Sequence, residues 1–254
     1  MTILDSAPRE VLDAYRTCEF VTLGRDGTPL AWPAAVSRRA DGTLLLTTSL
    51  AFAQKALNVR RDGRVALLFS DPTGSGLADA PHIFVGGRAE CPDDIMTSPQ
   101  GAEDYWRILF ERQPHSRSYL SRPARRLMDW YYLRLLITVT AEQVIVRPAA
   151  PPPAPQAPAT PDAGTALPGA VQLAGYPTAV LAARDGSGAP VLARVRPVQT
   201  DAGFAVRVPD DCGERYVRGQ DVETLGQYGL FEFREGGRRI AAEFVPHHLR
   251  GTAQ

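Results

Sequence analysis

A short stretch of the sequence, "TTSLAFAQK", combines the groups that bind a phosphate. Thr47, Thr48 and Ser49 place three hydroxyls at the end of an apolar run, and Lys55 follows inside residues 49–63, which are predicted to form a helix capped by Ser49. Free backbone N–H groups and the positive end of the helix dipole favour an anion at a helix start. Helical side chains tilt toward the N-terminus, so we expect the ammonium to reach back to the hydroxyls and close a phosphate pocket.

Lys55 is the single lysine among the 28 lysines and arginines of the chain. A strong preference for arginine would tend to replace any lysine that arginine can replace, so its retention hints that a compact ammonium is needed. The spacing alone leaves a plainer alternative open, in which Ser49 only caps the helix and Lys55 is a solvated helix residue.

The elements that must position these groups are mainly strands. Antiparallel strands joined by hairpin turns, with one short crossover helix, favour a β-barrel over a doubly wound sheet. Further helices are expected over residues 101–113 and 121–132, and two short strands within residues 132–148. The remaining predicted strands cover residues 19–24, 33–39, 42–48, 64–70 and 82–91.

A Pro/Ala-rich segment, residues 148–168, divides the chain. It is almost free of charge and of large apolar groups, so we expect an extended spacer between a first domain, residues 1–147, and a smaller β domain, residues 169–254. The second domain repeats the opening in weaker form, because "FVTLGRDGTPLAWPAAV" resembles "AVLAARDGSGAPVLARV". We therefore expect a degenerate half-barrel there, without the threonines and the lysine of the first.

The composition excludes several classes of protein. The formal net charge is zero, so no basic excess supports nucleic-acid binding. No apolar run reaches the roughly 18 residues of a membrane span, and the opening residues do not form a signal peptide. Three widely spaced cysteines argue against a disulfide framework or a cysteine zinc site and are typical of the cytoplasm.

The ordered set "DGTP", "PAAV", "DGTLLLTTS" and "KALNVRRDGRVALLF" resembles the FMN-binding split β-barrel family, typified by pyridoxamine 5′-phosphate oxidase and the flavin/deazaflavin oxidoreductases. The resemblance covers roughly residues 10–147. It implies a mainly β (α+β) split barrel that binds FMN, usually as a homodimer with the flavin at the subunit interface. It also implies that the strand-end hydroxyls and the helix lysine meet the flavin phosphate.

The resemblance assigns further residues to the cofactor. The backbone of Ala34, Ala35 and Val36 would lie along the flavin ring, and His82 would reach across from a second subunit. Gln54 stands where the family often has an arginine, a departure that weakens the charge pairing with the phosphate.

The expected function is flavin-dependent hydride or electron transfer to an unidentified small molecule, with no side chain assigned as a catalytic acid or base. An F420-dependent reductase is one alternative, and a non-catalytic flavin or haem carrier or sensor is another. Vitamin B6 oxidation is not expected, because the substrate arginines of true pyridoxamine phosphate oxidases have no match near the C-terminus. No metal site is expected, since His247 and His248 would point apart on a strand, and His115 reads as solvated. Tyr105, Trp106, Trp130, Tyr131 and Tyr132 are predicted to pack in the core.

Overall fold

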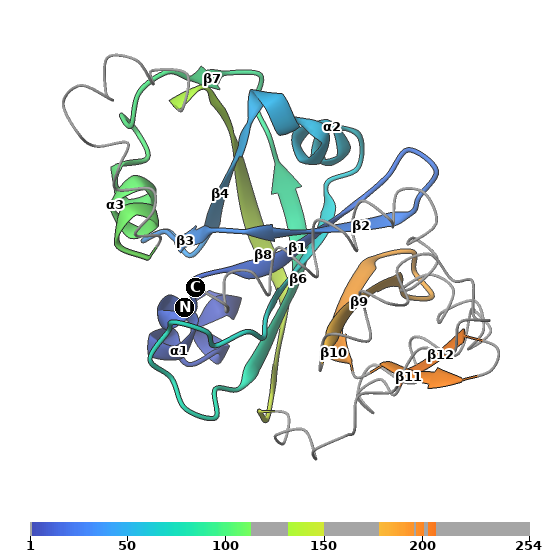
Figure 1. Cartoon of the computed structure of the whole chain (residues 1–254). Helices are drawn as coiled ribbons and strands as arrows, with labels where there is room; N and C mark the ends of the chain where they lie inside the picture. The colour runs from blue at the N-terminus through green and yellow to red at the C-terminus, as the bar shows by residue number, and fades with distance from the viewer. Residues whose placement is uncertain (1, 113–131, 150–177, 196, 201–202, 207–254) are drawn as a thin grey trace.

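The fold centres on one curled antiparallel sheet with helices at its margins (Figure 1). The computed structural model describes residues 2–112, 132–149, 178–195, 197–200 and 203–206. The eight strands of the sheet are β1 (Cys18–Leu23), β2 (Pro29–Ala34), β3 (Val36–Arg38), β4 (Leu44–Ser49), β5 (Arg64–Phe69), β6 (His82–Glu90), β7 (Ile95–Met96) and β8 (Arg134–Arg147). The helical elements are η1 (Ile3–Ser6), α1 (Arg9–Ala14), η2 (Leu50–Phe52), α2 (Gln54–Arg61) and α3 (Glu103–Arg112).

The strand order explains why the sheet closes. It runs β2-β1-β5-β6-β8-β4-β3, with β7 added beside β8. The two ends of this order, β2 and β3, are consecutive in the chain and are separated only by Ala35. The sheet must therefore curl until its edges meet, which is the split barrel that the sequence predicted.

Apolar side chains that point inward fill the barrel. Phe20, Leu46, Leu67 and Ile137 come from four different strands and belong to one buried cluster, each at most 1% exposed. α2 adds Ala56 and Val59 to the same cluster. The barrel is thus a packed core that holds the start of α2 against one of its ends.

The prediction of two short strands within residues 132–148 was wrong, because β8 is one strand of 14 residues. Its first half pairs with β4 and its second half with β6, so one continuous strand connects these two neighbours in the sheet. The register with β6 shifts between Gly86 and Gly87. A Cβ atom on Gly87 would clash with the backbone carbonyl oxygen of Thr140, so only glycine fits this close crossing.

Two further hairpins are described beyond the barrel. β9 (Ala179–Arg184) pairs with β10 (Pro190–Val195), and β11 (Pro197–Thr200) pairs with β12 (Gly203–Val206). β10 contacts β1, β5 and β6, and β9 contacts β2, so the first of these hairpins lies against the barrel. Residues 150–177, 196, 201–202 and 207–254 lie outside the described residues, and His247 and His248 are among them.

The β1–β2 and β9–β10 hairpins have the same construction. Each has two strands of six residues, and each loop closes with equivalent backbone hydrogen bonds, Gly24 N–H to Thr28 C=O in one and Asp185 N–H to Ala189 C=O in the other. Gly27 and Gly188 occupy equivalent positions in the two loops, and both have a positive φ. When the two loops are aligned on these glycines, the two "RDG" triplets are offset by two positions. The likeness therefore lies in hairpin geometry and not in the shared triplet.

Candidate functional site

The end of β4 presents its hydroxyls to two different faces of the sheet. Neighbouring residues of a strand point in opposite directions. Leu46 belongs to the interior cluster, so Thr48 shares the inner face, whereas Leu45 packs with α3 on the outer face that Thr47 and Ser49 share. Thr48 therefore points away from Thr47 and Ser49, and the binding of one anion by all three hydroxyls stays a prediction.

Thr47 is held in a polar contact on the outer face. Its hydroxyl donates to the Tyr105 hydroxyl at 2.9 Å and accepts from the Arg134 guanidinium at 3.1 Å. Arg134 also lies 5.3 Å from the centre of the Trp106 ring, a cation–π distance. The Thr47 hydroxyl proton is thus donated to Tyr105, within the protein. Arg134 places a positive charge at the end of β4.

Thr48 and Ser49 build the turn that leaves the strand. The Thr48 hydroxyl donates to the carbonyl of Phe52 at 2.8 Å, and Thr48 is only 2% exposed. The Ser49 hydroxyl accepts from the N–H of Ala51 at 3.3 Å, so Ser49 caps a helix as predicted. The helix it caps is the short η2, because the predicted single helix over residues 49–63 breaks at Ala53 and resumes as α2.

Lys55 lies in the first turn of α2 and is half-buried. Its ammonium nitrogen lies 5.7 Å from the centre of the Trp32 ring. Trp32 pairs directly with Phe20 across β1 and β2, so the two rings share the inner face of the sheet. The lysine therefore reaches toward β2 at the mouth of the barrel and is not a solvated surface residue.

Asn58 fixes the position of α2. This fully buried amide donates to the Thr22 hydroxyl at 2.9 Å, and its oxygen accepts from Gln54 at 2.7 Å and from Arg61 at 2.9 Å. Arg61 also donates to the carbonyl of Leu23 at 2.7 Å. The side chain of Gln54, predicted to face the phosphate, thus turns along the helix to Asn58.

Residues 34–36 join the two edges of the barrel. Ala34 and Val36 pack with the interior cluster, whereas Ala35 packs with the outer cluster under α3. Ala34 lies two residues beyond Trp32 on the same face of β2, which brings this backbone and Lys55 to one end of the barrel.

His82 lies far from these residues within one chain. It pairs with Arg147 on β8, whereas Thr47 pairs with Leu136, and the 11 residues between these two positions (147 − 136) span roughly 35 Å along the strand. Burial, and then the positive charge of Arg194, lowers the pKa of His82 to about 4, so its imidazole is neutral at pH 7. That His82 approaches a cofactor from a second subunit stays a prediction.

The sequence interpretation did not include Trp32, which contacts Lys55, or Arg134, which contacts Thr47. Both carried a usable signal, since Trp32 stands two positions before Ala34 and Arg134 opens the apolar run "RLLITV". The prediction that Tyr105, Trp106 and Tyr132 pack in the core is confirmed, because they are 3%, 2% and 8% exposed. Trp130, Tyr131 and His115 lie outside the described residues.

Comparisons with known proteins find similar solved structures but no family. No protein-family model and no curated protein matches the chain. Among similar solved structures, a putative pyridoxamine 5′-phosphate oxidase from Listeria innocua is 17% identical, with a TM-score of 0.35 over 54% of this chain and 91% of that one. An F420 reductase is 22% identical, with a TM-score of 0.40 over 55% and 98% of the two chains. An FAD-binding protein from Mesorhizobium loti is 20% identical, with a TM-score of 0.40 over 59% and 95%.

The chain is similar to these three solved structures, and all three TM-scores lie below 0.5. At these identities and TM-scores we infer its function from its own residues and not from theirs. The described helices are also too short to cross a lipid bilayer.

Proposed function

We propose that this chain binds a flavin phosphate, FMN, at the barrel end where β4 leads into α2, and that it acts as an oxidoreductase on a small molecule. The observation that carries the proposal is the position of Lys55. The single lysine of the chain, half-buried, extends over Trp32 at the mouth of the barrel. A compact ammonium beside an aromatic ring suits a ligand that joins a phosphate to a planar ring.

The charges at this end of the barrel suit a phosphate monoester. Such a group carries about −1.5 to −2 at pH 7. Lys55 supplies one positive charge. Arg134, the cross-strand neighbour of Ser49, supplies a second, which compensates for the neutral Gln54 at the position where the family often has an arginine. Ser49 accepts the N–H of Ala51 and keeps its own proton for donation.

The residues present thus fit the cofactor, but their roles differ from those that the sequence predicted. Lys55, Ser49 and Arg134 would hold the phosphate, and the backbone of residues 34–36 would flank the ring. Thr47 and Thr48 would position Arg134 and the η2 turn instead of contacting the phosphate. A bound flavin supplies the hydride or electron transfer, and the protein orients it and excludes water.

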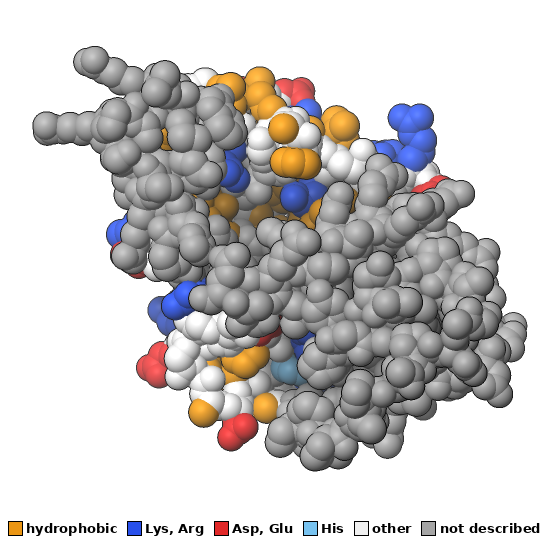
Figure 2. All heavy atoms as spheres, in the orientation of Figure 1, with side chains coloured by type: hydrophobic (Ala, Val, Ile, Leu, Met, Phe, Trp, Pro, Cys, Tyr) orange, Lys and Arg blue, Asp and Glu red, His pale blue; other side chains and the backbone are white. Residues whose placement is uncertain are grey.

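A homodimer in the cytoplasm completes the proposal. Four large apolar side chains are exposed around η2, α2 and β7: Leu50, Phe52, Leu57 and Ile95, which are 37%, 74%, 50% and 49% exposed. Figure 2 shows hydrophobic side chains gathered on this part of the surface. Exposed apolar clusters of this kind favour association, and a second copy of the chain is the partner that symmetry favours.

The test is to identify what the purified full-length protein carries. Mass spectrometry of the extracted small molecules should find FMN, and the protein should absorb near 450 nm. Detection of F420 by its mass would instead identify a deazaflavin as the ligand of this site, and a Soret band would indicate a haem carrier. Protein that carries no flavin and binds neither FMN nor F420 on titration would refute the proposal.

A further inference from the structure

The outer face of β1 and β5 is buried although it lies outside the barrel core. Five side chains on this face are at most 1% exposed: Glu19, Val21, Leu23, Ala66 and Leu68. None of them belongs to the interior cluster, which takes the alternate residues of the same strands. These strands are therefore buried on both faces, and the contacts of β10 with β1 and β5 identify the hairpin β9–β10 as the covering layer.

A charged residue, Glu19, lies on this face near the start of β1. The Glu19 side chain is 0% exposed, and its carboxylate accepts from the Arg194 guanidinium of β10 at 2.7 Å. Ser70 joins both partners, since its hydroxyl donates to Glu19 at 3.1 Å and accepts from Arg194 at 2.8 Å. Arg194 is 9% exposed at its side chain and also donates to the Thr178 hydroxyl at 3.1 Å. The two parts of the chain thus meet through a buried, hydrogen-bonded ion pair.

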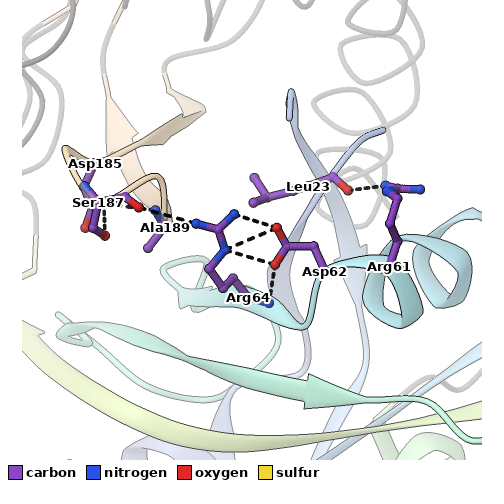
Figure 3. A network of polar contacts seen from close by, with 7 residues as sticks. All are labelled: Leu23, Arg61, Asp62, Arg64, Asp185, Ser187 and Ala189. Carbon is purple, nitrogen blue, oxygen red and sulfur yellow. Dashed lines mark hydrogen bonds and ion pairs between the residues drawn. The ribbon is translucent and has the colours of Figure 1, made fainter. Parts of the chain in front are cut away.

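A second contact ties the hairpin loop to the barrel at the surface. Arg64 of β5 donates to the carbonyl of Ser187 at 3.4 Å and forms an ion pair with Asp62 at 2.6 Å (Figure 3). The Arg64 and Asp62 side chains are 36% and 26% exposed. The contact with the hairpin loop is one long hydrogen bond at an exposed arginine, so it contributes less than the buried ion pair.

A buried carboxylate discriminates strongly between hairpins. A hairpin without an arginine at the position of Arg194 would remove the guanidinium from the buried Glu19 carboxylate, and breaking a buried ion pair in this way costs far more than the pair contributes. Moving the register by one residue would turn Arg194 to the other side of its strand. The equivalent position in the β1–β2 hairpin is Pro33, which cannot supply the charge.

We propose that the outer face of β1 and β5 is a docking surface specific for an arginine-bearing β-hairpin, with β9–β10 of the same chain as its occupant and Glu19 as the residue that selects it. The surface lies on the opposite face of β1 from the one near Lys55, so the proposal is independent of flavin binding. A second copy of the chain must then bind elsewhere.

The test is hydrogen–deuterium exchange on the full-length protein with Glu19→Leu, Arg194→Met and the double variant. Each single variant removes one member of the buried ion pair, so amides of residues 178–195 should exchange on the order of 100-fold faster, while β4 and α2 keep wild-type protection. The double variant replaces the ion pair with apolar groups, so the exchange rates of residues 178–195 should return to within roughly 10-fold of the wild-type rates. Asp13→Asn is the control, because it breaks an ion pair with Arg38 inside the first part of the chain.

Two results would overturn the proposal. Unchanged exchange of residues 178–195 in both single variants would show that Glu19 does not select the hairpin. Equal acceleration across the whole chain would show that the hairpin is an inseparable part of the core and not a docked layer. If a single variant does not fold, Ser70→Ala removes the bridging hydroxyl without leaving a charge unpaired, and several-fold faster exchange confined to residues 178–195 is then expected.

Discussion

The ammonium nitrogen of Lys55 lies 5.7 Å from the centre of the Trp32 ring, which joins the start of α2 to the inner face of β2. A cation–π contact of this kind stabilises the side chain by about 0.5–1 kcal/mol at a partly exposed site. It keeps the ammonium at the mouth of the barrel before any ligand arrives. The contact also distinguishes this lysine from a surface residue that samples many rotamers in solvent.

Arg134 should contribute to phosphate binding. Arg134→Gln removes a charge-assisted contact, so the Kd for FMN should rise about 10-fold while the Kd for riboflavin, which lacks the phosphate, stays unchanged. Isothermal titration calorimetry with both ligands measures the two values. Arg88→Gln is a matched control, because it changes the net charge equally at a side chain that is 66% exposed on β6. Equal effects of the two substitutions would remove Arg134 from the site.

His82 should make the protein less stable as the pH falls. Its pKa is lowered to about 4 in the folded chain, from 6.5 in the unfolded chain, chiefly by burial. Between pH 6.5 and pH 4 the unfolded state therefore binds more protons than the folded state. The stability that His82 contributes is fully present above pH 6.5 and is lost as the pH falls toward 4. Urea unfolding of the wild type and of His82→Asn at pH 7.5 and 5.0 should show a smaller loss in the variant. The same loss in both proteins would contradict the assignment.

Phe52 should contribute to self-association. Phe52→Ser removes the most exposed of the large apolar side chains beside α2, so the dimer should weaken by at least about 10-fold in Kd. Sedimentation velocity over a range of concentrations measures this. Ile3→Ser is the control, because Ile3 is 44% exposed in η1. A wild-type protein that is monomeric at every concentration would refute the homodimer, and equal effects of both substitutions would exclude this surface.

The sequence predicted the barrel because its signals are local. Hairpin turns such as residues 24–28 and 39–43, and apolar strands such as β1 and β5, report their structure over a few neighbouring residues. The 14-residue β8 was read as two strands because its pairing partner changes along its length, and only the three-dimensional arrangement shows this.

The site was harder to predict because it depends on directions and on distant residues. Thr47 and Thr48 are adjacent in sequence, yet the strand geometry sends one to Tyr105 and the other to Phe52. Gln54 faces Asn58 because that amide is buried against Thr22, a contact 36 residues away in sequence. The Glu19–Arg194 pair spans 175 residues, and no local pattern indicates it.

The most direct test of the flavin proposal compares FMN with riboflavin on Lys55→Ala and on the wild type, by titration of flavin fluorescence. Wild-type protein should bind FMN more tightly than riboflavin, and the variant should lose roughly 10- to 100-fold in FMN affinity while binding riboflavin as before, since only the charge-assisted contact with the phosphate is removed. Lys55→Arg should restore only part of the loss, because a planar guanidinium does not replace a compact ammonium. Unchanged FMN affinity in Lys55→Ala, or an equal loss for both ligands, would contradict the account.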